Sequence, residues 1–232
     1  QLREILETFA CFRPDLGYIQ GMSYLAAMLC LYFSTGTTSD SENTYMAFQC
    51  LANLMVSQHL FVFYLMDADL AAPYYDVFED LQAVHAPALH AHVRELGIKP
   101  SMYVFSWLQT LFLQVLPLEI ASRVWDNFLM DGTVFLFRTA LAILDLLGSE
   151  LLKHEFEICM PILQKKPRHR AMWDDLITVS ELWLAPEAAA RPCAPFLTPS
   201  PAAMRLARSK RCSKRSRPCM SPQRAETSLM RS

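Results

Sequence analysis

RPDLGYIQGMSYLAAMLCLYF, residues 13–33, is the stretch around which we expect the chain to fold. Pro14 and Gly17 interrupt any helix that precedes it, and the run that follows is apolar on nearly every face of a helix. The spacing predicts a helix over residues 18–33 that lies at the centre of the fold.

Gln20 is the polar side chain in the first turn of that predicted helix. Its amide can donate one hydrogen bond and accept another, so it can hold a water molecule in a chosen orientation. Gly21 lacks a side chain and would let another molecule come close, and the free N–H groups of a first helical turn favour anions. A structural interpretation, in which Gln20 satisfies its own loop, stays open and is the one that spacing alone favours.

The composition fits one sizeable domain followed by a chemically different tail. The chain has 232 residues, 53% of them hydrophobic, which is enough for a substantial core. From Arg191 onward there are ten Lys/Arg and one acidic residue, whereas the first 190 residues carry eleven basic and twenty-two acidic ones. We therefore expect a domain over residues 1–185, which does not favour nucleic acid, and a disordered basic tail over residues 186–232. The tail could contact acidic lipids, serve as a nuclear address or simply be solvated.

Several chemistries find no support in the sequence. Seven cysteines without a CxxC pair argue against a zinc site and a disulfide scaffold, and they fit a reducing, intracellular compartment. No Walker A loop, GxGxxG, GxSxG or kinase motif occurs, so we predict no nucleotide site and no cofactor of the chain's own. We expect the acidic cluster Asp76/Glu79/Asp80 on a solvated helix face, and His85, His90 and His92 on the surface or in loops.

The remaining periodicity predicts helices and no strands. Besides residues 18–33, the expected helices cover residues 1–12, 43–55, 69–84, 87–96, 117–130, 134–147, 151–159 and 171–184. Ser41 or Asn43 would cap the second of these, and Pro73 would lie in the first turn of the third. The apolar stretches 16–33 and 102–118 are marginal in length for a membrane span, and we interpret them as buried helices. The predicted fold is all-α, an irregular multi-helix domain.

A second informative segment covers residues 116–137 and reads LPLEIASRVWDNFLMDGTVFLF. Its predicted inner stripe consists of Leu118, Ala121, Trp125 and Phe128. Arg123 and Asp126 lie on the opposite face, where they can hydrogen-bond neighbouring loops. We assign Arg123, Trp125 and Asp126 to structure and not to catalysis.

Residues 13–27 and 116–137 together resemble the TBC domain of Rab GTPase-activating proteins, over roughly residues 1–185. The resemblance implies a helical domain that accelerates GTP hydrolysis by Rab proteins in vesicle trafficking. Tyr18-Ile19-Gln20 matches the family's Tyr-x-Gln motif, so Gln20 would be the catalytic finger that positions the attacking water. Tyr18, Gly21 and Met22 would support it. Phosphoryl transfer is accelerated mainly by orienting the water and offsetting charge, and a neutral glutamine suits only the first task.

The family's other finger is an arginine in an Ile-x-x-Asp-x-x-Arg motif. No such motif precedes Tyr18, and neither Arg3 nor Arg13 fits its pattern. An arginine finger is worth about 10³–10⁵ in rate, so Gln20 alone would leave most of the acceleration unsupplied. The chain begins within a helical pattern, and we expect a preceding part of the domain.

The resemblance also implies the partners. The chain would be an enzyme regulator whose partner is a GTP-bound Rab protein, and that partner would bind the GTP and Mg²⁺. We expect it in the cytoplasm, peripherally associated with endomembranes, with no transmembrane segment. Two alternatives stay open: a Rab-binding module without GTPase activation, and a small multi-pass membrane protein built on the two apolar stretches.

Overall fold

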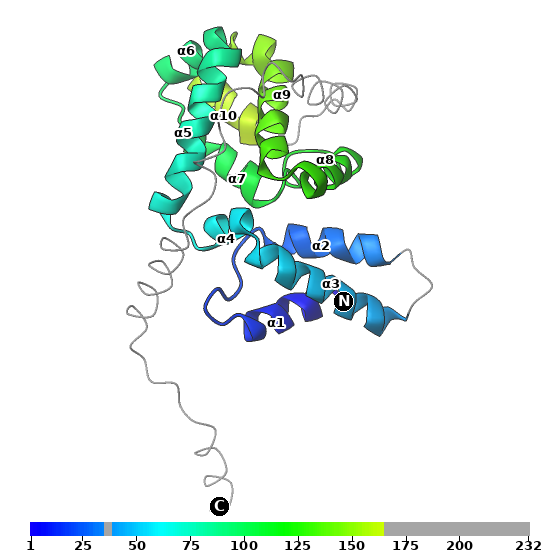
Figure 1. Ribbon diagram of the computed structural model, residues 1–232. Helices are drawn as coiled ribbons and strands as arrows, with labels where there is room; N and C mark the ends of the chain where they lie inside the picture. Colours follow the sequence, from blue (N-terminus) through cyan, green and yellow to red (C-terminus); the bar gives the residue numbers. More distant parts are fainter. Residues whose placement is uncertain (35–38, 165–232) are drawn as a thin grey trace, which may run out of the picture. The chain divides into compact units, whose positions relative to one another are not determined.

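The computed structural model describes residues 1–34 and 39–164, and within these ranges it contains helices and no strand (Figure 1). The elements are α1 (Leu2–Phe12), α2 (Met22–Phe33), α3 (Asp40–Val56), α4 (Gln58–Tyr64), α5 (Ala68–His85), α6 (Pro87–Glu95), η1 (Pro100–Met102), α7 (Val104–Gln109), α8 (Leu118–Asp131), α9 (Thr133–Leu151) and α10 (Phe156–Gln164). The predicted all-α fold is confirmed. The predicted helix at residues 171–184 and the predicted tail at 186–232 lie outside the described residues.

Helices α1, α2 and α3 pack against one another (Figure 1). The apolar spacing of α1 buries Ile5 and Phe9, and the helix ends at Phe12, two residues before Pro14, as predicted. Helix α2 buries Met22, Leu25, Ala26, Met28 and Leu29. Tyr24, Leu31 and Tyr32 of the same helix are exposed, so its apolar surface is only partly covered.

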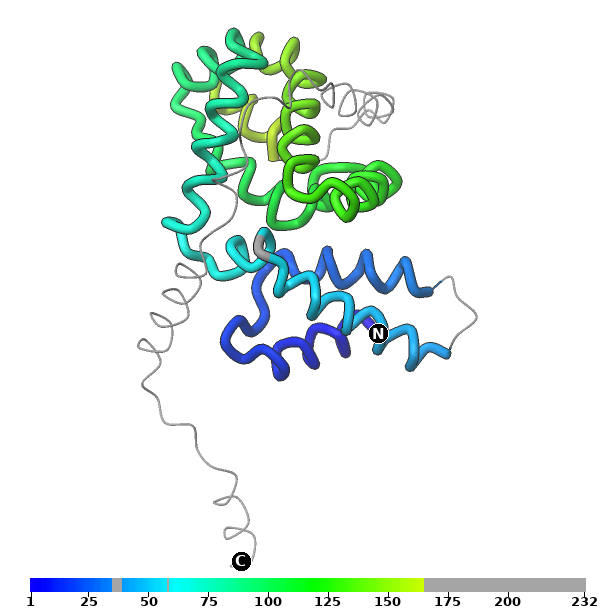
Figure 2. Tube along the Cα trace, in the orientation of Figure 1, coloured from blue at the N-terminus to red at the C-terminus, as the bar shows by residue number. Residues whose placement is uncertain are grey.

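The start of α2 differs from the prediction by four residues. The helix begins at Met22 and not at Tyr18, so Gln20 lies in the turn before the helix and not in its first turn. Gly21 has φ +107°, a conformation that interrupts a right-handed helix and that side-chain-bearing residues rarely adopt. Figure 2 shows the chain winding between α1 and α2 through this irregular segment.

Helix α3 starts earlier than predicted because its cap lies further upstream. The Ser39 hydroxyl accepts a hydrogen bond from the Glu42 N–H at 3.4 Å, and Glu42 Oε2 accepts one from the Ser39 N–H at 3.1 Å. This reciprocal capping box fixes the first turn at Asp40. The prediction that Ser41 or Asn43 caps the helix is wrong, since both lie inside it.

Aromatic rings of α4, α5 and α7 contact one another in the core. The His59 ring of α4 lies 5.0 Å from the Phe63 ring and 5.5 Å from the Tyr74 ring, centroid to centroid. Helix α6 ends at Glu95 and, as predicted, Gly97 terminates it: the Gly97 and Ile98 N–H groups bond the last turn in a Schellman motif. Pro73 is the sixth residue of α5, so its predicted place in the first turn is wrong.

The apolar stretch 102–118 is not one buried helix. Helix α7 stops at Gln109, and Leu111 and Phe112 adopt positive φ values of 48° and 64° while their side chains are fully buried. Burial of these apolar side chains outweighs the local cost of the backbone conformation. Of the helices that the structure describes, none is both long enough and apolar enough to cross a bilayer.

The C-terminal described helices follow the predicted order with shifted ends. In α8, Ala121, Trp125 and Phe128 are buried as predicted, but Leu118 is 46% exposed and Ile120 and Val124 are buried instead. Helix α9 continues through Gly148, where the prediction ended it, to Leu151. The predicted helix at 151–159 is displaced to Phe156–Gln164.

Candidate functional site

The segment between α1 and α2 is a structured turn at residues 13–21. Its first half is closed by hydrogen bonds from the Leu16 and Gly17 N–H groups to the Arg13 carbonyl oxygen, at 3.1 and 2.8 Å. The Arg13 guanidinium donates two hydrogen bonds of 2.8 Å to the Asp15 carboxylate, which lowers the pKa of that carboxyl. The guanidinium carbon of Arg13 also lies 5.9 Å from the centre of the Phe61 ring of α4.

Gln20 and Tyr18 point out of this turn. The Gln20 side chain is exposed, and Tyr18 is 55% exposed. An exposed amide at the tip of a turn can contact a second protein. The backbone N–H groups of Met22 and Tyr24 are already bonded within the turn, to the carbonyl oxygens of Ile19 and Gly21, both at 3.1 Å. Fewer free N–H groups are therefore left at this helix start to bind an anion than the sequence led us to expect.

Gly21 comes close to the chain's own helices and not to open space. A Cβ added to it would lie 3.1 Å from Gln109 Oε1 and 3.2 Å from the Tyr64 hydroxyl. The expectation that Gly21 leaves room for another molecule is wrong, because α4 and α7 occupy that room. The requirement for glycine is thus internal: it lets the turn lie directly on two buried polar side chains.

Met22 holds the backbone on the other side of Gln20, at Ile19. Its side chain is fully buried, and its sulfur accepts a hydrogen bond from the Ile19 N–H at 3.4 Å. The Tyr64 hydroxyl donates to the Gln109 carbonyl oxygen at 3.1 Å, and burial raises the pKa of Tyr64, with a further contribution from Tyr18. The turn is therefore fixed on both sides of an exposed Gln20.

Gln109 and Tyr64 are the residues that the sequence analysis did not connect with this turn. Both are buried, on elements separated by more than forty residues from Gly21 and from each other. The one signal in the sequence is that Gln109 is a polar residue within a strongly apolar stretch. A buried amide needs partners, which predicts a polar contact but not its location.

The second motif, in α8, holds its polar groups differently. Trp125 is 2% exposed, and its Nε1 has no hydrogen-bond partner among the described residues. The Asp126 carboxylate accepts a hydrogen bond from the Tyr32 hydroxyl of α2 at 3.2 Å, so its partner is a helix and not the expected loop. Burial, and then Asp126, raises the pKa of Tyr32. Arg123 is exposed, and its carbonyl oxygen accepts from the Asn127 amide at 2.8 Å.

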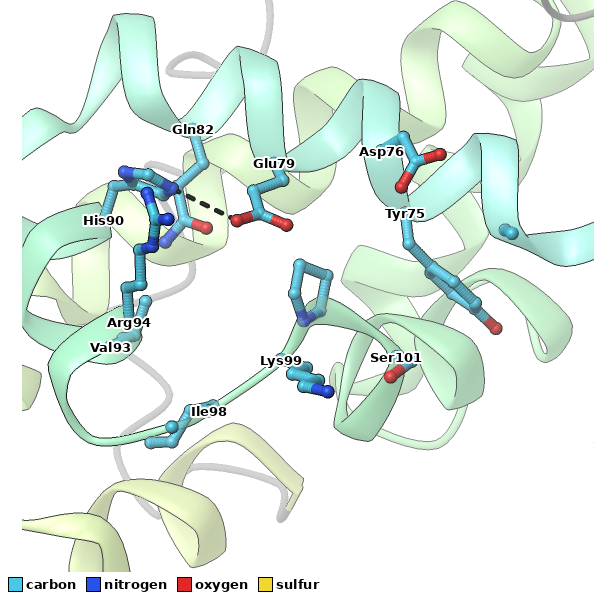
Figure 3. Close-up of a pocket in the computed structure, with 13 residues that line it drawn as sticks. Tyr75, Asp76, Glu79, Gln82, His90, Val93, Arg94, Ile98, Lys99 and Ser101 are labelled. Atoms are coloured by element: carbon cyan, nitrogen blue, oxygen red, sulfur yellow. Dashed lines mark ion pairs between the residues drawn. The ribbon is translucent and has the colours of Figure 1, made fainter. Parts of the chain in front are cut away.

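A pocket of about 430 Å³ lies apart from both motifs, between α5, α6 and the segment at residues 97–101 (Figure 3). Glu79 and His90 face each other across it, with Glu79 Oε1 3.6 Å from His90 Nε2. Gln82 is buried beside them, and its Nε2 has no partner among the described residues. The sequence placed His90 and His92 on the surface or in loops; both lie on α6 and are partly exposed, which excludes the loop and leaves the surface.

This pocket does not select one ligand chemistry. Its α5 wall carries carboxylates and its other wall carries Arg94 and Lys99, so both signs of charge are present (Figure 3). Within the described residues no group of three or more His, Cys, Asp or Glu side chains could hold a metal ion. The 13–21 turn is therefore the candidate site.

The sequence profile of the Rab-GTPase-TBC domain matches residues 1–152 of the chain, a range that contains both motifs. The chain belongs to the Rab-GTPase-TBC domain family. This confirms the resemblance that residues 13–27 and 116–137 predicted.

Relatives of this TBC chain agree with that assignment. It is 37% identical over 166 residues to TBC1 domain family member 14 of Homo sapiens, covering 72% of this chain and 23% of that protein. It is 37% identical to TBC1 domain family member 12 of Xenopus tropicalis with the same coverage. It is 33% identical over 175 residues to Drainin of Dictyostelium discoideum, covering 75% of this chain and 38% of that protein. The chain thus spans well under half the length of these relatives.

Solved TBC structures share the fold. The Ypt/Rab-GAP domain of Gyp1p superposes with a TM-score of 0.64 at 18% identity, covering 80% of this chain and 65% of that one. The Chlamydomonas flagellar RabGAP TBC domain gives a TM-score of 0.62 at 20% identity, covering 77% and 57%. At these identities the likeness establishes the helical architecture of the TBC domain.

Proposed function

We propose that this TBC chain takes part in activating GTP hydrolysis by a Rab-family GTPase, with Gln20 as the side chain that orients the attacking water. The single observation that supports this most strongly is the exposed Gln20 amide on a turn fixed at both sides, inside the family's Tyr-x-Gln motif. The family match and the relatives support a Rab protein as the partner.

The proposed chemistry needs little from this chain beyond geometry. Hydrolysis of GTP is accelerated by orienting water and by stabilising charge on the phosphate oxygens, and there is little covalent work to do. One amide can accept a hydrogen bond from the water and donate another, which sets the water's orientation. Because the backbone is fixed on both sides of Gln20, the amide has fewer orientations to lose on binding, which lowers the entropic cost of placing it. GTP and Mg²⁺ belong to the Rab partner in this proposal, and the chain contributes no cofactor.

Charge stabilisation is assigned neither to Arg13, in the turn, nor to Arg3, at the start of α1. Arg13 is held by two hydrogen bonds to Asp15, and Arg3 Nε is paired with Glu7 Oε1 at 2.7 Å on the exposed face of α1. Neither lies in an Ile-x-x-Asp-x-x-Arg pattern. The pairing of both arginines with carboxylates is the observation that favours a second candidate function, in which the chain binds a GTP-loaded Rab without accelerating hydrolysis.

The cellular setting follows from the proposed partner. A regulator of Rab proteins would act in vesicle trafficking, in the cytoplasm and peripherally at endomembranes. Co-fractionation of the intact protein with membranes that carry its target Rab tests this part of the proposal. Recovery in fractions free of that Rab would contradict it.

The decisive experiment is single-turnover GTP hydrolysis on a panel of GTP-loaded Rabs, with the intact protein in excess. Gln20→Ala should lower the stimulated rate on the target Rab by about 100-fold, because the water loses its orienting amide. Gln49→Ala is the matched control: Gln49 is exposed on α3 and donates to the Tyr45 hydroxyl of the same helix at 2.9 Å. Full stimulation by Gln20→Ala would exclude the glutamine finger. Binding without stimulation by the wild type would establish the second function.

A further inference from the structure

We propose that Gln109 is a positioning residue for the Gln20 finger, acting through Gly21 together with Tyr64. The inference rests on the proposed function, because it gives Gln109 a part in the same reaction. The two buried side chains, Tyr64 at the end of α4 and Gln109 at the end of α7, are called the Gly21 seat below.

The contact between Gly21 and the seat is tight. The hydrogen that replaces a side chain on Gly21 points at both Gln109 Oε1 and the Tyr64 hydroxyl, since a Cβ there would lie 3.1 and 3.2 Å from these atoms. Contacts of this kind between an α-hydrogen and an oxygen are weakly attractive. They also set a lower limit on how closely the turn can approach α4 and α7.

The seat is itself held in place. Tyr64 is fully buried and Gln109 is 6% exposed. The Tyr64 hydroxyl donates to the Gln109 carbonyl oxygen at 3.1 Å, and the Gln109 Nε2 lies 4.0 Å from the Met66 sulfur. Helices α4 and α7 contact each other directly, so the seat belongs to the packed core and not to a loop.

The position of Gly21 then decides where Gln20 can point. Gln20 lies between Gly21, which rests on the seat, and Ile19, whose N–H is bonded to the Met22 sulfur. A shift of Gly21 therefore rotates the backbone that carries the Gln20 side chain. Gln109 is too deeply buried to contact a Rab protein, so its replacement should change the rate of hydrolysis and not the affinity.

The test compares Gln109→Ala with Gln114→Ala in the intact protein. Gln114 is a partly exposed glutamine in the irregular segment that follows α7, five residues after Gln109. Gln109→Ala should lower the saturated single-turnover rate on the target Rab about tenfold, and leave the affinity for GTP-loaded Rab within about threefold. Without any Rab, it should increase amide hydrogen exchange at residues 19–22. Gln114→Ala should change none of the three.

A double variant separates positioning from general damage. In a Gln20→Ala background, Gln109→Ala should cause no further loss of rate, because the residue acts through Gln20. If Gln109→Ala lowers the thermal midpoint by more than about 10 °C, Gln109→Met, which conserves volume, takes its place in the same measurements. Additive losses, a parallel loss of affinity, or unchanged exchange at residues 19–22 would overturn the inference.

The two proposals fail separately. Full stimulation by Gln20→Ala, or a wild type that stimulates no Rab, would remove the proposed function. The exchange measurement needs no Rab and still decides whether Gln109 fixes the turn.

Discussion

The 13–21 turn and the α8 segment at residues 123–126 are both motifs of the TBC family, yet they place their side chains in opposite ways. In the turn, the backbone at Gly21 is buried against α4 and α7 while Tyr18 and Gln20 project into solvent. In α8, Trp125 is buried and Asp126 bonds to Tyr32 of the same chain. In the proposed function, Gln20 acts on a partner and needs a firmly held backbone, whereas Asp126 has its partner inside the fold.

The largest expected effect is on the free energy of unfolding, for a substitution in α8. Trp125→Ala should lower the free energy of unfolding by about 3–5 kcal/mol, because it empties a large buried site. Gln20→Ala should change it by no more than about 0.5 kcal/mol, because the side chain is exposed. Urea unfolding followed by circular dichroism measures both. The comparison would be wrong if Gln20→Ala were as destabilising as Trp125→Ala.

Lowering the pH should destabilise the packing of α4 against α7, the two helices that Gly21 contacts. His59 of α4 is buried, its Nε2 lies 3.1 Å from the Leu108 carbonyl oxygen, and burial lowers the pKa of His59 to about 4 from 6.5. Between pH 6.5 and 4 the unfolded chain binds a proton that the folded chain does not, so stability falls as the pH falls, by about 3 kcal/mol over the window.

The control for this pH dependence is His59→Phe, which cannot titrate. Unfolding free energies of the wild type and the variant, measured at steps from pH 7 to 4, should show a shallower slope for the variant. Equal slopes would mean that His59 is not held neutral, and that acid does not act on the α4–α7 contact beside Gln109.

A smaller effect on stability is expected for glycine substitutions in the 13–21 turn. Gly17 and Gly21 both have positive φ, 63° and 107°, but a Cβ at Gly17 would meet nothing within 4 Å. Gly17→Ala should cost about 1 kcal/mol from the backbone alone, and Gly21→Ala about 2–3 kcal/mol because it also displaces the seat. Gly21→Ala should in addition lose most of the GTPase stimulation. Equal effects of the two substitutions on unfolding and on hydrolysis would remove the special role of Gly21.

Local spacing predicted those helices whose ends are marked by a proline or a glycine in the sequence. Helix α1 shows the period of 3.6 and stops before Pro14, and α6 stops at Glu95, two residues before Gly97. The same reasoning failed for residues 102–118, where buried Leu111 and Phe112 take positive φ. Sequence patterns do not report such conformations, because the packing that stabilises them comes from distant residues.

The candidate site was predictable in part. Gln20 was singled out as the polar residue in the first turn of the helix predicted over residues 18–33, and from the Tyr-x-Gln resemblance. Its location in a turn, the burial of Gly21, and the contribution of Tyr64 and Gln109 were not predictable. These residues are far apart in sequence, and no local pattern links a glycine to the helices that happen to pack against it.

The sequence by itself determined an all-α chain of the TBC family, since hydrophobic periodicity and two motifs suffice for both. Only the tertiary structure decided that Gln20 stands outside α2 and that Gly21 rests on Tyr64 and Gln109. The physical reason is that helical periodicity is a property of neighbouring residues, whereas the direction of an exposed side chain is fixed by the buried atoms beneath its backbone.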